Sequence, residues 1–469
     1  MLNYLKKHPK GLWILCGIEI WERFSYYGMR AILILYLTSE FYGMSDTKAY
    51  LTYGSYVAFV YMAPLIGGYV SDVYLGHTRS VKYGCITILI GHLLLSLDVS
   101  FFLGLGFVVV GTGFFKSAMN VNIGELYQGK EELKDSGYTL FYMCVNLGGA
   151  LATLSVPLIA LYLGWHAGFI TAAGGMALGL LILTIGQHKN LVPQDHIDPT
   201  SKTKLITLVL TICAGVVFAY LINNASNTAY ILYSLSILAL GYLAYRGYKG
   251  GQVYIKSISA VVIISIVIMF FWVLFEQTAT SLVLFNKRFV DLHLFGMKIS
   301  AANINVINNI SIVCLSPLFA FIWNKWNISV FTKMGLGIII TGSAMGVFGF
   351  AAFTAMHGSL APLLFIVLGI VLVTVGELCC SPTGLAAISK IAPTDIAALL
   401  FGVWGIKSGI SNFLAGYVAT FTDKKSVTSD LVIQAKAFFD VYLYLAVSAI
   451  IIGLIVISLS KAFNKAFNI

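Results

Sequence analysis

Charged residues are scarce in this chain. They make up 10% of its 469 residues, whereas soluble domains carry about 25%. Hydrophobic residues make up 59%, and the mean hydropathy is +0.88. Polar linkers are also missing, although a soluble chain of this length would divide into about two or three domains. These properties exclude a soluble globular protein, a disordered protein and a coiled coil, and they indicate a polytopic membrane protein.

Several chemical motifs are absent as well. The seven cysteines show no C-x-x-C spacing, so a zinc or disulfide framework is not expected. The chain has no H-E-x-x-H and no Walker A sequence, so we expect no metal, no cofactor and no nucleotide. Gly104, Gly106, Gly111 and Gly113 are instead interpreted as small residues for close helix packing. Neither the clustered polar groups of a membrane enzyme nor the filter of a channel is found, so no enzymatic activity is expected.

Basic residues are concentrated in the turns between apolar runs. The net charge is +10, from 29 Lys and Arg against 19 Asp and Glu. Of the basic residues, 18 lie in loops on the side of the N-terminus, 7 lie on the opposite side and 4 lie inside apolar runs. The positive-inside rule therefore predicts that both termini are cytoplasmic. The first run lacks a small-residue cleavage site, so we expect a transmembrane helix there and not a signal peptide.

Fourteen apolar runs are long enough to cross a bilayer, for which a helix needs about 20 residues. The polar segment 187–204 follows the sixth run and suggests a division into 6, 2 and 6 runs. We therefore predict an all-α membrane fold with two six-helix bundles, 1–188 and 251–469, and an inserted pair within 189–250. Two such bundles are typical of major facilitator transporters. The runs lie near 12–39, 51–76, 79–98, 101–128, 137–163, 166–187, 204–222, 228–246, 256–288, 299–323, 329–355, 360–391, 397–422 and 434–460.

Eight charged side chains fall inside these runs. A charge within the membrane is costly, so each one is a candidate functional residue. Structural ion pairs between helices are the simpler interpretation, but eight charges are more than packing requires, and a water-filled cavity explains them better. The N-terminal half has three of these cations against two carboxylates, and the C-terminal half has two carboxylates against one cation. Walls of opposite net charge suit a zwitterionic substrate. The eight are Glu19, Glu22, Arg23, Arg30, Lys116, Glu276, Glu377 and Lys407.

Residues 19–28 read E-I-W-E-R-F-S-Y-Y-G. This segment resembles the E-x-x-E-R-F-x-Y-Y-G signature of the proton-coupled oligopeptide transporter (POT) family, within the major facilitator superfamily. Other segments resemble family motifs in the expected order, and the similarity extends from residue 19 to about 416. The extra helix pair near 204–246 is what bacterial members carry. The other segments lie at 68–79, 111–127, 141–148, 271–277, 377–384 and 402–416.

The resemblance implies two six-helix bundles that rock around a site at the membrane midplane. It implies symport of di- and tripeptides with protons, driven by the proton gradient without a cofactor. It also implies a bacterial cytoplasmic membrane, a monomer, and peptides, protons and the bilayer as partners, with no nucleic acid. Because such a transporter accepts many side chains, affinity must come from the constant charged ends of the peptide.

The resemblance also implies roles for individual residues. It assigns proton coupling to Glu19, Glu22, Arg23, Lys116 and Glu276. Arg30 and Lys116 are expected to bind the peptide carboxylate, and Glu377 is expected to bind the peptide ammonium. Hydrogen bonds to the peptide backbone are expected from Tyr27, Tyr61, Asn146 and Asn308. The pockets for the peptide side chains are expected to be lined by Trp272, Phe275, Ser381 and Trp404. Asp72 and Arg79, in the loop after the second run, are expected to act in gating. Arg30 paired with Glu276 is expected to form an outer gate.

Three departures from the family pattern affect substrate selectivity. Lys116 is followed by Ser117-Ala118 where K-P-N is usual, and Asn308-Asn309 replaces the N-P of helix eight. Lys407 stands where an uncharged residue is expected, and it is predicted to pair with Glu377 or Glu276, which would weaken ammonium binding. The alternative to a peptide symporter is a same-fold, proton-coupled transporter of another small zwitterion or anion, such as a modified amino acid or nitrate.

Overall fold

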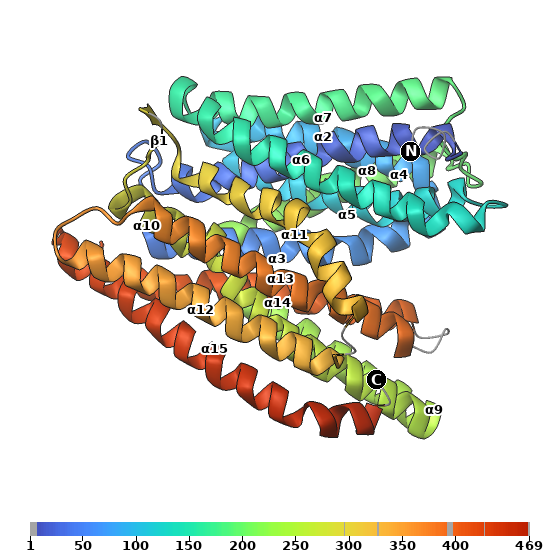
Figure 1. Ribbon diagram of the computed structural model, residues 1–469. Coiled ribbons are helices and arrows are strands. Elements are labelled where there is room, and N and C mark those ends of the chain that lie inside the picture. The colour runs from blue at the N-terminus through green and yellow to red at the C-terminus, as the bar shows by residue number, and fades with distance from the viewer. Residues whose placement is uncertain (1–6, 295, 326–327, 392–396, 426, 468–469) are drawn as a thin grey trace. The chain divides into compact units, whose positions relative to one another are not determined.

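Long helices make up nearly all of the structure, a computed structural model that describes residues 7–294, 296–325, 328–391, 397–425 and 427–467 (Figure 1). A short antiparallel hairpin pairs β1 (His293–Leu294) with β2 (Met297–Lys298). The helices are α2 (Lys10–Leu37), α3 (Asp46–Val70), α4 (His77–Leu95), α5 (Phe101–Leu126), α6 (Lys134–Leu163), α7 (Trp165–His188), α8 (Ser201–Asn223), α9 (Ser226–Phe275), α10 (Ser281–Phe289), α11 (Val306–Lys325), α12 (Val330–Met356), α13 (Leu363–Ile391), α14 (Ala397–Ala419) and α15 (Leu431–Phe467).

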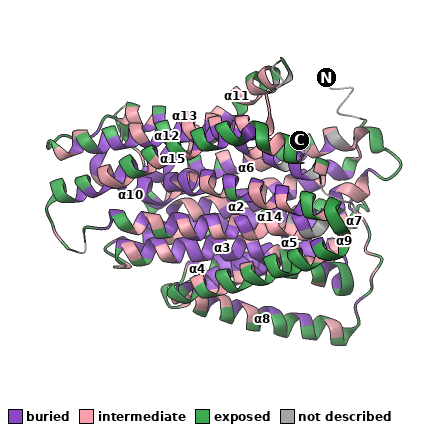
Figure 2. Ribbon diagram, turned by 90° about the horizontal axis from the view of Figure 1, so that it is seen from below, coloured by how far each residue is buried: buried purple, intermediate pink, exposed green. Residues whose placement is uncertain are grey.

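Each of the fourteen predicted runs falls mainly on helical residues. Among the described residues, ten stretches are long and apolar enough to cross a membrane by length and composition. Fourteen spans therefore stay a prediction. Large apolar side chains are exposed along α8 and α15, which Figure 2 shows in green for α8. Outward-facing apolar residues of this kind suit helices that lie against lipid.

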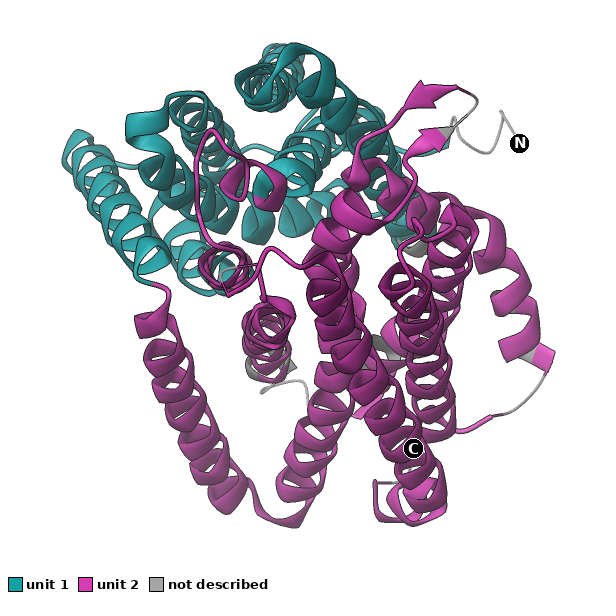
Figure 3. Cartoon of the chain, turned by 90° about the vertical axis from the view of Figure 1, so that its left-hand side faces the viewer, with its two compact units in different colours: residues 1–33, 59–224 teal, residues 34–58, 225–469 magenta. Residues whose placement is uncertain are grey.

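The longest helix, α9, is divided by one residue. Gly251 has φ 72° and ψ −164°, a backbone conformation that glycine adopts far more readily than other residues. Residues from 240 to 247 line a groove of about 400 Å³ together with residues from 255 to 263, so the two arms fold back on each other. In Figure 3 the magenta helix that follows the unit boundary runs to a bend and returns. The two arms correspond to the separate runs predicted at 228–246 and 256–288.

The chain forms two compact units (Figure 3). Unit 1 comprises residues 1–33 and 59–224, and unit 2 comprises residues 34–58 and 225–469. The two inserted helices are thus assigned to different units. Helix α8 belongs to unit 1, and the arm of α9 that precedes Gly251 belongs to unit 2. This grouping differs from the predicted boundaries at 188 and 250, because α8 packs against α5. The three-part division stays a prediction.

Close packing in unit 1 depends on glycines, as the sequence predicts. A Cβ on Gly104 of α5 would stand 2.7 Å from the carbonyl oxygen of Gly91 on α4, and a Cβ on Gly91 would meet the carbonyl of Gly104 at 2.9 Å. On another face of α5, Gly106 lies against the backbone of Gly215 on α8. Such contacts let helix backbones approach closely, as small residues do in membranes. They fix α5, which carries Lys116, between α4 and α8.

In unit 2, α12 packs along both α13 and α15. Aromatic rings fill the space between α10 and α15, where the Phe285 ring centroid lies 5.4 Å from that of Phe438 and 6.3 Å from that of Tyr442. All three side chains are buried. Edge-to-face contacts of this kind add to the free energy gained from burial alone. This core supports the break after α9, where the chain leaves the α-helix at residues 276–279.

Candidate functional site

Four charged side chains meet in unit 1. Glu19, Glu22 and Arg23 lie on α2 at positions i, i+3 and i+4, so they share one face of the helix. Lys116 reaches this face from α5, with Nζ 2.7 Å from Oε1 of Glu19 and 3.5 Å from Oε2 of Glu22. The Arg23 Nη2 donates to Oε1 of Glu22 over 2.6 Å, and Arg23 Nε lies 3.4 Å from Oε1 of Glu19. The structure thus brings together the four unit-1 residues predicted for proton coupling.

The four charges in this cluster are balanced, with two carboxylates facing two cations. Glu19 and Glu22 are each 1% exposed and Arg23 is 7% exposed. Breaking a buried pair by removing one partner costs about 3–5 kcal/mol, because an uncompensated charge remains. Adding a proton to one carboxylate has the same electrostatic effect as removing that partner's charge. Protonation therefore leaves Lys116 or Arg23 without one of its anions and ready for another.

Glu19 connects the cluster to a cavity. A cavity of about 370 Å³ in unit 1 is lined by Glu19 and Lys116 together with Asn120, Tyr138 and other residues of α5 and α6. Oε2 of Glu19 is buried and has no hydrogen-bond partner within the part of the chain that the structure describes. Lys116, with 27% of its side chain exposed, is the more open of the two. A small molecule in this cavity would therefore lie next to both Glu19 and Lys116.

The other substrate-binding residues predicted in unit 1 lie on α2, α3 and α6. The rings of Tyr26 and Tyr27 lie 5.0 and 5.5 Å from Cζ of Arg23, within range of a cation–π interaction. Asn146 on α6 donates its Nδ2 to the carbonyl of Tyr142 over 2.9 Å. Arg30 lies two turns beyond Arg23 on α2 and is half-buried, as is Tyr61 on α3. The roles predicted for these side chains toward a peptide stay predictions.

Two predicted carboxylates lie in unit 2. Glu377 on α13 accepts a hydrogen bond from Nδ2 of Asn308 over 3.2 Å, and the same nitrogen lies 2.9 Å from Oγ1 of Thr374. Glu276 is buried and opens the 3₁₀ turn Glu276–Ala279 that follows α9. A break in a membrane helix frees backbone groups and is typical of transporter binding sites. Since Arg30 lies in unit 1, its predicted pairing with Glu276 joins the two units and stays a prediction.

The aromatic residues predicted for side-chain pockets gather around Lys407. The Trp272 and Phe275 rings meet edge to face with centroids 4.9 Å apart. Nζ of Lys407 lies 4.0 Å from the Trp404 ring centroid and 5.8 Å from that of Trp272. Among the described residues Lys407 forms no ion pair and its Nζ has no hydrogen-bond partner. The predicted pairing of Lys407 with Glu377 or Glu276 is therefore wrong, because the ammonium lies against indole rings instead.

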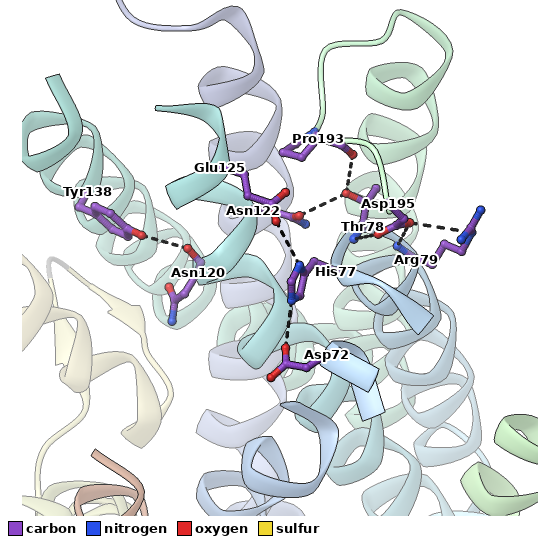
Figure 4. A network of polar contacts seen from close by, with 10 residues as sticks. All are labelled: Asp72, His77, Thr78, Arg79, Asn120, Asn122, Glu125, Tyr138, Pro193 and Asp195. Atoms are coloured by element: carbon purple, nitrogen blue, oxygen red, sulfur yellow. Dashed lines mark hydrogen bonds and ion pairs between the residues drawn. The ribbon is translucent and has the colours of Figure 1, made fainter. Parts of the chain in front are cut away.

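The loop predicted for gating begins with a change of helix type. After α3 the chain forms a π-helical turn, Ser71–Leu75, which carries Asp72. Gly76 follows with φ 81°, and a Cβ there would stand 2.5 Å from Oδ1 of Asp195. Both the backbone conformation and the lack of space therefore favour glycine at this position. His77 lies between two carboxylates, with Nε2 3.0 Å from Asp72 and Nδ1 3.2 Å from Glu125 (Figure 4).

A segment after α7 fastens the start of α4. We call residues 191–198 the strap. The carboxylate of Asp195 accepts hydrogen bonds from the backbone N–H groups of Thr78 over 2.8 Å and Arg79 over 3.0 Å, which caps α4 (Figure 4). The Thr78 hydroxyl donates to the carbonyl of Pro193 over 2.7 Å. The Arg79 guanidinium bonds the carbonyl of Ile197 and, over 3.1 Å, the carboxylate of Asp198.

Two contacts were missed by sequence reasoning. The strap belongs to the polar segment 187–204, which was interpreted only as a connection, and nothing in the sequence indicates that Asp195 caps a helix 117 residues away. In unit 2, Arg288 of α10 pairs with Asp46 of α3 through two contacts of 2.7 and 2.6 Å. A signal for this second pair was available, because Asp46 and Arg288 are opposite charges predicted on the same side of the membrane.

The model of the POT family matches residues 78–439, which is more than half of the chain. The chain belongs to the POT family. The match includes the helices that carry Lys116, Glu276, Glu377 and Lys407, and the expectation of an all-α major facilitator fold is confirmed. A POT-family chain is a multi-pass membrane transporter and not an enzyme.

Individual relatives of this POT-family chain extend the similarity toward its N-terminus. The uncharacterized transporter YclF of Bacillus subtilis is 32% identical over 440 residues, covering 89% of both proteins. Peptide transporter YePEPT of Yersinia enterocolitica is 32% identical over 450 residues, covering 88% of this chain and 87% of that protein. The crystal structure of tetrameric PepTSo2 superposes with a TM-score of 0.86 at 27% identity, covering 97% of this chain and 98% of that chain.

Proposed function

We propose that this POT-family protein is a secondary active symporter that imports di- and tripeptides together with protons by alternating access. The observation that carries the proposal is the balanced cluster of Glu19, Glu22, Arg23 and Lys116, in which one proton changes the charge available to a ligand. Membership of the POT family and the similarity to peptide transporter YePEPT support the substrate class.

The coupling follows from the cluster's electrostatics. When Glu19 or Glu22 takes a proton, Lys116 loses part of its ion pairing and its ammonium can bind the C-terminal carboxylate of a peptide, together with Arg30. When the proton leaves, the carboxylate competes for Lys116 again and the peptide is released. Glu276 is proposed to take part in the same proton transfer, and its pairing with Arg30 is proposed as the outer gate.

The remaining groups bind the rest of the peptide. Glu377, which accepts a hydrogen bond from Asn308, is proposed to bind the peptide ammonium. Asp72 and Arg79, held through His77 and the strap, are proposed to gate the opposite side. The peptide backbone and its side chains are proposed to contact Tyr27, Tyr61, Asn146, Asn308, Trp272, Phe275, Ser381 and Trp404.

The cellular setting is also part of the proposal. The protein is proposed to lie in a bacterial cytoplasmic membrane, because its relatives in Bacillus subtilis and Yersinia enterocolitica are bacterial transporters. The distribution of basic residues supports both termini in the cytoplasm. We propose that a single chain is the transporting unit, even where chains assemble as in tetrameric PepTSo2. The energy source is the proton gradient, with no cofactor.

The test is uptake of labelled dialanine into proteoliposomes that contain the purified protein. With an inward proton gradient, dialanine should accumulate above its outside concentration. An uncoupler should reduce the inside concentration to the outside value. Absence of accumulation by folded protein would refute the proposal, and nitrate and single amino acids would then be screened as substrates.

A further inference from the structure

Lys407 is a buried cation without an anion. It is 4% exposed, and its Nζ has no hydrogen-bond partner and no ion pair among the residues that the structure describes. An ammonium group has three N–H donors and no acceptor. Burial of such a group is costly unless it is paired, and this cost is the reason that lysines are rarely fully buried. The ammonium group of Lys407 therefore needs an anionic or hydrogen-bond-accepting partner in addition to its contacts within the described part of the chain.

The two indole rings compensate only part of that cost. Nζ lies 4.0 Å from the Trp404 ring centroid and 5.8 Å from that of Trp272. Ring faces attract a cation through their quadrupole, but they accept no strong hydrogen bond. Arg23 in unit 1 shows the contrast, since it has two tyrosine rings and two carboxylates as well. The arrangement at Lys407 has the rings and lacks the carboxylate.

The missing carboxylate can come from the substrate, because Lys407 lies beside the helix that carries Glu377. Glu377, Ser381 and Gly384 stand at positions i, i+4 and i+7 on α13 and so share a face. A Cβ on Gly384 would stand 2.9 Å from the Trp404 ring, which places that indole beside this face. Oγ of Ser381 is buried and has no hydrogen-bond partner among the described residues, so it is a second polar group on this face that a ligand could satisfy.

The distances suit a short peptide. Seven residues along α13 correspond to about 10 Å, at about 1.5 Å per residue. An extended peptide covers about 3.3–3.6 Å per residue, so one that places its ammonium at Glu377 can place a later side chain near Trp404. The group that this side chain offers to Lys407 must be negatively charged, and aspartate and glutamate carry such a charge at neutral pH.

We propose that Lys407 binds the side-chain carboxylate of an acidic residue in the transported peptide and gives this transporter a preference for acidic peptides. The proposal rests on the proposed function as a peptide symporter. Because charge-assisted hydrogen bonds are stronger than neutral ones, the preference over the isosteric amide should be about tenfold or more. The contact between Lys407 and an acidic side chain would determine selectivity, in addition to the contacts that bind the two ends of the peptide.

The test compares peptides that differ only in side-chain charge. Proteoliposomes would take up labelled Ala-Glu and Ala-Gln, and in a second pair Ala-Asp and Ala-Asn, at pH 7 under the same gradient. The KM of the wild-type protein should be about tenfold lower for the acid than for the amide in at least one pair. In Lys407→Met and Lys407→Gln the acid-to-amide ratio of KM should move to about 1 or reverse. The exposed Lys436→Met variant is the matched control and should keep the wild-type ratio.

Each outcome decides one proposal. A wild-type ratio near 1 in both pairs overturns the acidic preference without the need for any variant. An unchanged ratio in both Lys407 variants overturns the role of Lys407. Dialanine measured with the wild-type protein separates the two proposals, since failure to accumulate dialanine refutes the symporter itself, whereas accumulation without acid selectivity refutes only this inference.

Discussion

The two units differ in how the cations inside their helices are paired. In unit 1, Arg23 and Lys116 each contact both Glu19 and Glu22, so the cluster is electrically balanced. In unit 2, Lys407 lies against Trp404 and Trp272, and no carboxylate of the described residues pairs with it. A balanced cluster responds to a proton, whereas an unbalanced cation responds to an anion. The difference suggests that coupling is concentrated in unit 1 and selectivity in unit 2.

The largest expected effect is loss of coupling in unit 1. Glu22→Gln removes a titratable carboxylate and keeps the shape of the side chain, so the cluster no longer gains and loses a proton at this position. Dialanine accumulation should fall to the level seen with an uncoupler, while exchange of peptide across the membrane continues. Uptake and counterflow in the same proteoliposomes check this, with the exposed Glu132→Gln variant as control. Gradient-driven accumulation in Glu22→Gln would show that coupling does not use this residue.

The next effect is a contrast in stability between the two lysines. Lys116→Met should destabilise the protein by up to about 3–5 kcal/mol, because it leaves the carboxylates of Glu19 and Glu22 with one cation; partial exposure of Lys116 reduces that figure. Lys407→Met should be neutral or stabilising, because it removes an unpaired buried charge. Thermal unfolding in detergent measures both. The double variant Glu19→Gln with Lys116→Met should be more stable than Lys116→Met alone, because it also removes an unpaired carboxylate. Equal losses of stability in Lys116→Met and Lys407→Met would show that the two lysines are not paired differently.

A smaller effect is expected at the carboxylate proposed for the peptide ammonium. Glu377→Gln should weaken competition by dialanine by about 10–100-fold, since a hydrogen bond to a charged group contributes about 1.5–3 kcal/mol. N-acetylated dialanine has no ammonium and should be affected little. Competition against a labelled peptide measures both ligands in one assay. Equal losses for the two ligands would assign Glu377 a structural role instead.

The smallest effect concerns a charge that acts on backbone rather than on substrate. Asp195→Ala removes the acceptor for the N–H groups of Thr78 and Arg79, and loss of a helix cap costs about 0.5–2 kcal/mol. Thermal unfolding should show a lower midpoint. Asp198→Ala is the matched control, because its side chain is 88% exposed in the same strap and should change stability by less. Equal midpoints for the two variants would mean that the cap contributes nothing measurable.

The sequence predicted the positions of the helices and the contacts within α2 because these depend on local periodicity. Glu19, Glu22 and Arg23 are neighbours on any helix, and the spacing of the glycines on α5 predicted close approach. The pairing of Lys407 was wrong because opposite charges in the same half need not lie within reach, and an indole ring can take the place of a carboxylate. Asp195 was missed because its partners are backbone N–H groups, which leave no mark on residue type.

The bend at Gly251 bears on the predicted number of membrane crossings. The 50 residues of α9 would measure about 75 Å as one straight helix, far more than the hydrocarbon core of about 30 Å. Because Gly251 reverses the chain, each arm is close to the length of one crossing. The predicted number of crossings is then even, and an even number returns the C-terminus to the side on which the chain began. The prediction that both termini lie on one side of the membrane therefore depends on a single residue with positive φ.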